Sequence, residues 1–154
     1  MLFGVHPYDL VAISQLDKLF AEGERDVHYA KRREGATIVA CDVQHASENV
    51  FAGCMGTATV SEGYDILLTL VEDAYLVDVA TEKGEALFRL AEGAADADAQ
   101  DLKLREMVWE HNRQLLRKHE LKMDVKELPA LLERSYEHPV WEERARRCFS
   151  CGSC

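Results

Sequence analysis

The stretch "YDILLTLVEDAYLVDVA" (64–80) carries the clearest secondary-structure signal in the chain. Two apolar, β-branched runs flank Glu72 and Asp73, and the second run alternates in part, as strands with two different faces do. The pattern predicts a β-hairpin with its turn at these two acidic residues. We expect this hairpin to form part of a small sheet with flanking helices.

Further strands and helices are predicted before the hairpin. Pro7 suits the opening of a helix, and Gly35 suits the C′ position after a helix. Cys41 lies in a predicted buried strand, where a free cysteine behaves as a small core residue. The predicted elements are strand 2–5, helix 8–21, helix 26–35, strand 36–43 and loop 44–63.

Helical patterns dominate after the hairpin. Thr81 is the expected cap of a helix over 81–90, and the small, acidic stretch 91–100 reads as a linker. The helical pattern is interrupted near Pro129 and stops before Pro139. The predicted organisation is a mixed α/β domain (1–92), an acidic linker with a helical arm (93–147) and a cysteine terminus (148–154). The predicted fold class is therefore α+β, or mixed α/β.

The net charge and the hydropathy of the chain argue against several classes of function. The 154 residues include 18 basic and 28 acidic side chains, a net charge of −10. Such a balance argues against binding nucleic acid or anionic membranes, whose phosphates need Lys and Arg. No apolar run approaches the roughly 20 residues of a membrane helix, and the start of the chain lacks signal-peptide features. We expect a cytoplasmic protein without membrane insertion.

The last nine residues, "RRCFSCGSC" (146–154), hold three of the five cysteines. Cys148, Cys151 and Cys154 follow the spacing C-x2-C-x2-C, which allows one tight loop to wrap three thiolates around a 4Fe–4S cluster. These three residues are the predicted metal and cofactor ligands. The fourth cysteine of the bacterial run, followed by proline, is not in the sequence given, so the ligand set is incomplete.

Two other interpretations of the terminus remain open. Structural zinc usually takes two ligands from one knuckle and two from a distant one, so three evenly spaced thiolates plus a histidine or Cys54 fit less well. A tail with free thiols is the other interpretation. Either would make the chain a non-redox interaction domain. We find no dinucleotide fingerprint, phosphate loop or catalytic triad.

Seven segments, taken in order, resemble a known family. The chain is similar to the dicluster iron–sulfur electron-transfer subunits, which include the beta subunit of soluble nickel–iron hydrogenase (sulfhydrogenase) and the A subunit of anaerobic sulfite reductase. The segments are "GVHPYDLVAI…LD" (4–17), "YAKRREGATIVAC" (29–41), "FAGCMGT" (51–57), "GYDILLT" (63–69), "YLVDVATEKGEAL" (75–87), Trp141 and "CFSCGSC" (148–154).

The resemblance implies a non-catalytic component that relays electrons between partner subunits. The expected partners are a flavin or nicotinamide subunit and a hydrogenase or sulfite reductase subunit. It also implies a fragment, because the family's polypeptide begins earlier and continues into a second set of cluster ligands. Trp141 and the helical arm would pack beside the cluster.

The chain departs from the family at four positions. The family tends to read "GVRPCD" where this chain has "GVHPYD", which places His6 and Tyr8 at an arginine and a cysteine position. It tends to read "CFC" where this chain has Val50, Phe51 and Ala52. Any additional metal centre that uses those cysteines in relatives lacks its thiolates here.

Overall fold

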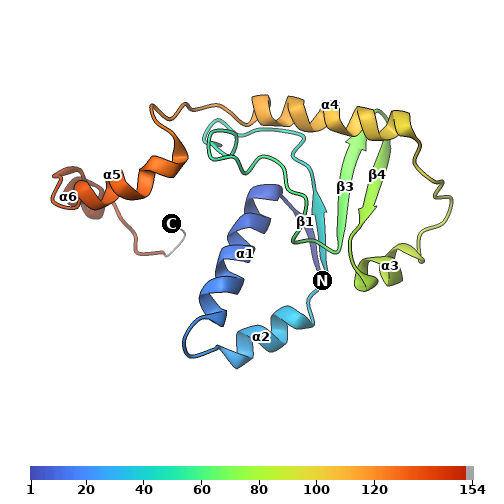
Figure 1. The fold of residues 1–154 in the computed structure, drawn as a ribbon, viewed down its shortest axis with the longest axis horizontal. Coiled ribbons are helices and arrows are strands. Elements are labelled where there is room, and N and C mark those ends of the chain that lie inside the picture. The colour runs from blue at the N-terminus through green and yellow to red at the C-terminus, as the bar shows by residue number, and fades with distance from the viewer. Residues whose placement is uncertain (152–154) are drawn as a thin grey trace. The chain divides into compact units, whose positions relative to one another are not determined.

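The structure, a computed structural model, describes residues 1–151. The chain divides into two compact units, Met1–Glu120 and Leu121–Cys154. The first is a four-stranded sheet with helices, which confirms the predicted mixed α/β class (Figure 1). Its elements are β1 (Leu2–Val5), α1 (Pro7–Ala21), α2 (Val27–Glu34), β2 (Ile38–Cys41), β3 (Ile66–Val71), β4 (Ala74–Val79), α3 (Glu82–Phe88) and α4 (Ala99–Leu115).

The sheet has the order β1-β2-β3-β4. The first three strands are parallel, while β3 and β4 form the predicted antiparallel hairpin, with Leu68 opposite Val77. Glu72 adopts φ 56° at the turn, the left-handed conformation that two-residue hairpin turns require. The three parallel strands therefore end at the same edge of the sheet.

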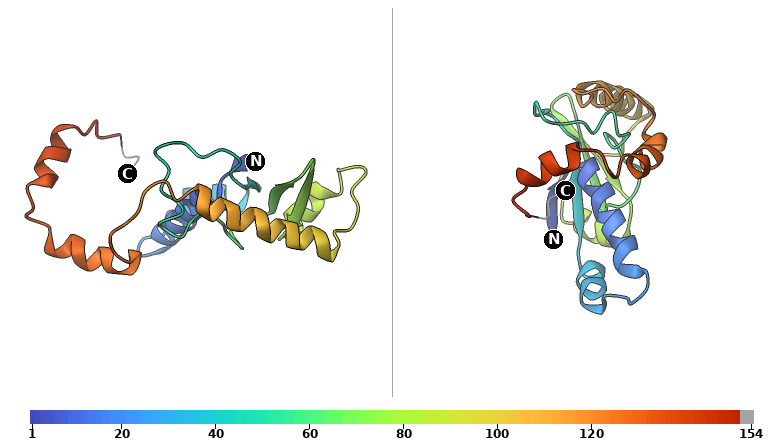
Figure 2. Two further views of the ribbon diagram at one scale, coloured as in Figure 1. Left: turned by 90° about the horizontal axis from the view of Figure 1, so that it is seen from above. Right: turned by 90° about the vertical axis from the view of Figure 1, so that its left-hand side faces the viewer.

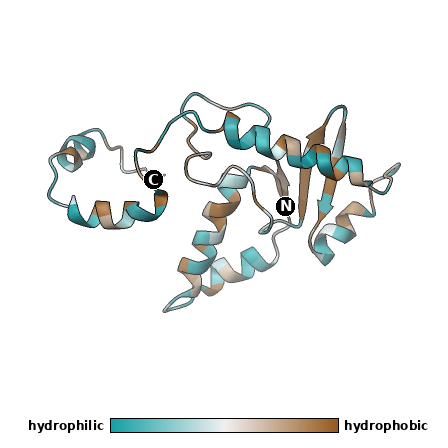
Figure 3. Ribbon diagram, turned by 45° about the horizontal axis from the view of Figure 1, so that its top comes forward, coloured by the Kyte–Doolittle hydropathy of each residue, from teal (hydrophilic) through white to brown (hydrophobic). Residues whose placement is uncertain are grey.

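Apolar residues of the two central strands form the core, and Figure 3 shows these strands as hydrophobic. Leu10 of α1 is buried in the same cluster as Ala40 and Leu67, which are paired across β2 and β3. Trp109 of α4 packs against that cluster. Two helices far apart in the sequence thus pack on one hydrophobic cluster, α1 beside β2 and α4 beside β3 (Figures 1 and 2).

Local sequence signals explain most helix boundaries. Pro7 occupies the first turn of α1, and the side chain of Thr81 accepts a hydrogen bond from the backbone of Gly84 at the start of α3. Asp26 caps α2 in the same way. The prediction for Gly35 is wrong in one respect, because it ends α2 with φ −78° and not in the left-handed conformation of a C′ glycine.

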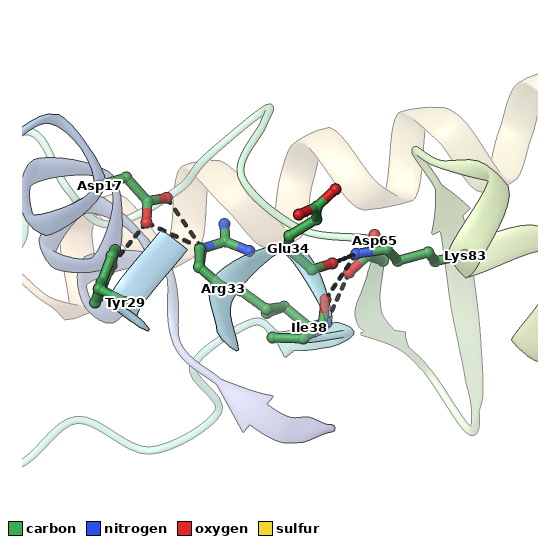
Figure 4. Close-up of polar contacts among 8 residues, drawn as sticks. Asp17, Tyr29, Arg33, Glu34, Ile38, Asp65 and Lys83 are labelled. Atoms are coloured by element: carbon green, nitrogen blue, oxygen red, sulfur yellow. Dashed lines mark hydrogen bonds and ion pairs between the residues drawn. The ribbon is translucent and has the colours of Figure 1, made fainter. Parts of the chain in front are cut away.

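Hydrogen bonds from side chains join the elements of this unit (Figure 4). The carboxylate of Asp65 accepts from the backbone N–H of Ile38 at 2.7 Å and from the hydroxyl of Thr81 at 2.5 Å. Lys83 of α3 donates to the carbonyl oxygen of Glu34 at the end of α2. The starts of β2, β3 and α3 are therefore fixed to one another by a single aspartate.

The first unit extends past the predicted boundary after residue 92 and includes α4. This helix begins at Ala99, inside the predicted linker, because Asp98 and Asp101 form a reciprocal capping box. It packs on β3, and the indole N–H of Trp109 donates to Asp42 at 2.8 Å. Burial of this face makes α4 part of the α/β unit.

The second unit consists of three short helical segments, η1 (Val125–Glu127), α5 (Leu128–Arg134) and α6 (Val140–Arg146). Pro129 lies in the first turn of α5, which ends before Tyr136 and is shorter than predicted. None of residues 121–151 is buried. Across residues 1–151, no helix combines the length and the apolar character needed to cross a bilayer.

Candidate metal centre

Two of the three predicted ligands lie in one exposed loop directly after α6. The backbone N–H of Cys148 closes the helix on Ala145, and the thiol of Cys148 is exposed. Ser150 adopts φ 54°, and its backbone N–H donates to the sulfur of Cys148 at 3.3 Å. Cys151 is also exposed, whereas Cys154 lies outside the described residues.

This loop has the chemistry of a thiolate metal site. Thiolate sulfur is the ligand of iron–sulfur clusters, and N–H groups directed at sulfur help to set their potentials. The left-handed turn at Ser150 places such a donor on Cys148. Within residues 1–151, however, no three His, Cys, Asp or Glu side chains are grouped to hold a metal. The described loop supplies two exposed cysteine thiols, those of Cys148 and Cys151.

The arginines at the end of α6, directly before the loop, form ion pairs with glutamates of the same helix. Arg146 pairs with Glu142 at 2.6 Å and Arg147 pairs with Glu143 at 3.0 Å, each across one turn of α6. Phe149, between the two cysteines, is 96% exposed. An aromatic side chain this exposed next to candidate ligands is available to pack against a further protein surface.

The other two cysteines lie in the first unit. Cys41 ends β2, where burial, with a smaller contribution from the charge of Asp42, raises the pKa of its thiol and favours the protonated form. The thiol of Cys54 donates to the carbonyl oxygen of Phe51 at 2.9 Å. Both side chains are half-buried, and neither belongs to a metal-binding group among the described residues.

A cavity of about 360 Å³ lies in the first unit, and the sequence did not predict it. Tyr8, Val50 and Ala52, the three positions that differ from the cysteines of the resembled family, all line it. Tyr8 precedes Val50 and Ala52 by more than forty residues, so only the fold brings it to them. None of the described lining residues is a cysteine, and the cavity therefore lacks thiolate ligands.

A buried carboxylate was also missed by the sequence analysis. One oxygen of Asp42 accepts from the hydroxyl of Thr69 at 2.5 Å and from Trp109, while the other has no hydrogen-bond partner among residues 1–151. Burial raises the pKa of Asp42, although those two hydrogen bonds and Arg105 oppose the shift. A charged residue directly after a buried strand was the only signal available.

The described residues comprise a mixed α/β unit and, in the second unit, a loop after α6 with two exposed cysteine thiols. Over 155 aligned residues, covering all of this chain, it is 30% identical to sulfhydrogenase 2 subunit beta from Pyrococcus furiosus (strain ATCC 43587 / DSM 3638 / JCM 8422 / Vc1). The chain spans 45% of that relative's length. No protein-family profile and no solved structure matches the chain. All of this chain is thus similar to a part of a hydrogenase beta subunit.

Proposed function

We infer that this chain is part of an iron–sulfur electron-transfer subunit of a multi-subunit anaerobic oxidoreductase. Cys148, Cys151 and Cys154 would hold a 4Fe–4S cluster, with a fourth ligand from outside the sequence given. The observation that carries the proposal is the exposed loop in which the backbone of Ser150 donates to the sulfur of Cys148. When bound, such a cluster supplies a reversible one-electron carrier.

The relative supports the class of assembly. Its name makes it the beta subunit of a sulfhydrogenase, and its similarity to this chain includes the segment with the three cysteines. Because the chain spans less than half of that relative, we propose that the chemistry and the remaining ligands lie elsewhere in the complex. The proposed partners are a flavin or nicotinamide subunit and a hydrogenase or sulfite reductase subunit, in the cytoplasm.

In this proposal the chain's own residues position the cluster and shield it. Cys148 and Cys151 provide sulfur ligands, and the N–H of Ser150 stabilises negative charge on the first of them. Trp141, whose indole N–H donates to the carbonyl of Ser135, gives α6 an aromatic surface that would exclude water beside the cluster. The sheet of the first unit would serve as the platform for a partner subunit.

The second candidate is an interaction domain that binds zinc, or nothing, through the same thiols. It rests on the two exposed thiols of Cys148 and Cys151, which are available to either metal. Zinc takes thiolate ligands as readily as iron does, so the ligand type alone does not separate the two candidates. Redox activity separates the two candidates, because zinc has a single stable oxidation state in proteins.

Electron paramagnetic resonance of the dithionite-reduced protein tests the first candidate. The full chain is reconstituted anaerobically with iron, sulfide and a small thiol that takes the place of the fourth ligand, and it is then reduced and reoxidised. We expect a signal from a reduced cluster that disappears on reoxidation and is lost in Cys148→Ser. Cys41→Ser is the matched control and should keep the signal, because Cys41 packs at the end of β2. A wild-type spectrum without any cluster signal would favour the zinc or free-thiol domain.

A further inference from the structure

The cavity of about 360 Å³ lies beyond the carboxyl ends of two parallel strands. Tyr8 follows β1, whereas Val43 and His45 follow β2, and all three line it. The volume falls within the range of about 300–1,000 Å³ that is typical of small-molecule sites.

The floor of the cavity is formed by buried side chains and is fixed to α4. Val43, Ala52 and Leu116 belong to one buried cluster, on which Tyr8 and Val50 pack. The backbone N–H of Gly53 donates to the carbonyl of Leu116 at 3.0 Å. An added Cβ at Gly53 would lie 2.7 Å from the carbonyl oxygen of Arg113, so the loop is pressed directly onto the helix.

Hydrogen bonds within the loop hold the remaining wall. The backbone N–H of Asn49 donates to the hydroxyl of Ser47 at 3.2 Å, and the backbone N–H of Thr57 donates to the carbonyl of Ala52 at 2.9 Å. The ring of His119 contacts the carbonyl oxygen of Glu48 at 3.0 Å, which joins the loop to the segment after α4. The cavity is therefore formed before any ligand arrives, which lowers the entropic cost of binding.

The lining residues determine what kind of molecule fits. The described lining contains no Lys, Arg, Asp or Glu, so nothing there neutralises a phosphate or carboxylate. Phe51, Tyr8 and Met55 offer aromatic and thioether surfaces, which pack well against an aromatic ring. His45, Ser47 and Asn49 add hydrogen-bonding groups at the exposed rim.

We propose that this cavity binds a small, uncharged aromatic molecule of about two fused rings that carries one polar substituent. The rings lie against Phe51 and Met55 over the apolar floor, and the substituent faces the polar rim at His45 and Asn49. The site belongs to the first unit and does not depend on the cysteine terminus, so it adds a ligand-binding function to the proposed electron-transfer role.

The test is a titration of the full chain with 2-naphthol, in which binding is detected by saturation-transfer nuclear magnetic resonance. We expect saturable binding of 2-naphthol, and binding of naphthalene-2-sulfonate weaker by about tenfold or more, because the sulfonate charge finds no counter-ion. Saturation without that preference would overturn the neutral-ligand assignment. No saturable binding of either probe would overturn the site.

Two variants locate the binding in the cavity. Ala46→Phe fills the cavity from its wall, and Asn49→Trp blocks it from the exposed rim without entering the core. We expect each to weaken 2-naphthol binding by about tenfold. Ala145→Phe on exposed α6 is the control and should bind like wild type. Unchanged affinity in a folded Asn49→Trp variant, shown by an unaltered circular dichroism spectrum, would overturn the proposal.

Discussion

Gly84 is the position at which a side chain is least compatible with the fold. A Cβ there would lie 2.1 Å from the carbonyl oxygen of Asp65, closer than any non-bonded contact allows. The side chain of Asp65 accepts hydrogen bonds from Ile38 of β2 and from Thr81, the cap of α3. Moving Asp65 away from residue 84 would therefore break these hydrogen bonds. Two of the segments behind the family resemblance, "GYDILLT" (63–69) and "YLVDVATEKGEAL" (75–87), therefore contain residues that hold the fold together.

Replacing Gly84 by alanine should destabilise the protein by about 2 kcal/mol or more, since the new methyl group meets fixed backbone. Gly35→Ala is the matched control, because a Cβ at Gly35 meets only ordinary contacts at 3.6 Å and its φ is negative. Urea unfolding followed by circular dichroism measures both. Equal midpoints for the two variants would show that the approach of α3 to Asp65 is looser than described.

Asp42 should make stability depend on pH. Its pKa in the folded state is raised above the ordinary value of 3.8, chiefly by burial, so the folded protein holds this proton more tightly than the unfolded chain does. The free energy of unfolding contributed by this group is therefore greatest below the unfolded pKa and falls as pH rises through the interval up to the folded pKa.

Asp42→Asn should remove that fall, because the amide keeps an acceptor for Thr69 and Trp109 without a buried charge. Urea midpoints measured across the acidic pH range compare the variant with wild type. Asp96→Asn, in the exposed acidic stretch, is the control and should behave like wild type. A slope that survives in Asp42→Asn would assign the pH dependence to other groups.

At the scale of elements, local patterns were sufficient for the hairpin and for the starts of α1 and α3. Alternation in 74–79, Pro7 and Thr81 each act within a few residues, so the sequence displays them directly. The placement of α4 was not predictable in this way. It depends on the contact between Trp109 and Asp42, which are 67 positions apart, and no local signal announces such a pair.

The start of α4 gives a direct test of its capping box. Asp98→Ala should lower the free energy of unfolding by about 1 kcal/mol, because the backbone N–H groups of Gln100 and Asp101 lose their acceptor. Thermal unfolding with Trp109 as the fluorescent reporter, in a Trp141→Phe background, follows the unit to which α4 belongs. Asp96→Ala is the control; a loss of similar size there would attribute the effect to overall charge.

At the scale of the whole molecule, the two units differ in what holds them together. The first has buried side chains in two clusters, whereas none of residues 121–151 is buried. Segments below about 40 residues usually need a metal, a disulfide or a partner to fold stably. The spacing of the cysteines was visible in the sequence, but the positions of Tyr8, Val50 and Ala52 around one cavity required the fold.

Cluster binding should therefore protect the second unit from proteolysis. Limited trypsin digestion of the reconstituted protein should leave Arg134 and Arg144 uncut at protease concentrations that cleave the metal-free protein there. Cys148→Ser treated identically should be cleaved at both sites. Equal cleavage of wild type and variant after reconstitution would mean that metal does not order this unit.

Binding of an iron–sulfur cluster by the cysteine terminus is measured by metal and sulfide analysis of the full chain, reconstituted anaerobically with a small thiol in place of the fourth ligand. We expect iron and acid-labile sulfide in equal amounts, lost when Cys148 and Cys151 are both replaced by serine and retained when Cys41 and Cys54 are replaced. Zinc without iron, or iron that remains bound after Cys148 and Cys151 are replaced, would contradict it.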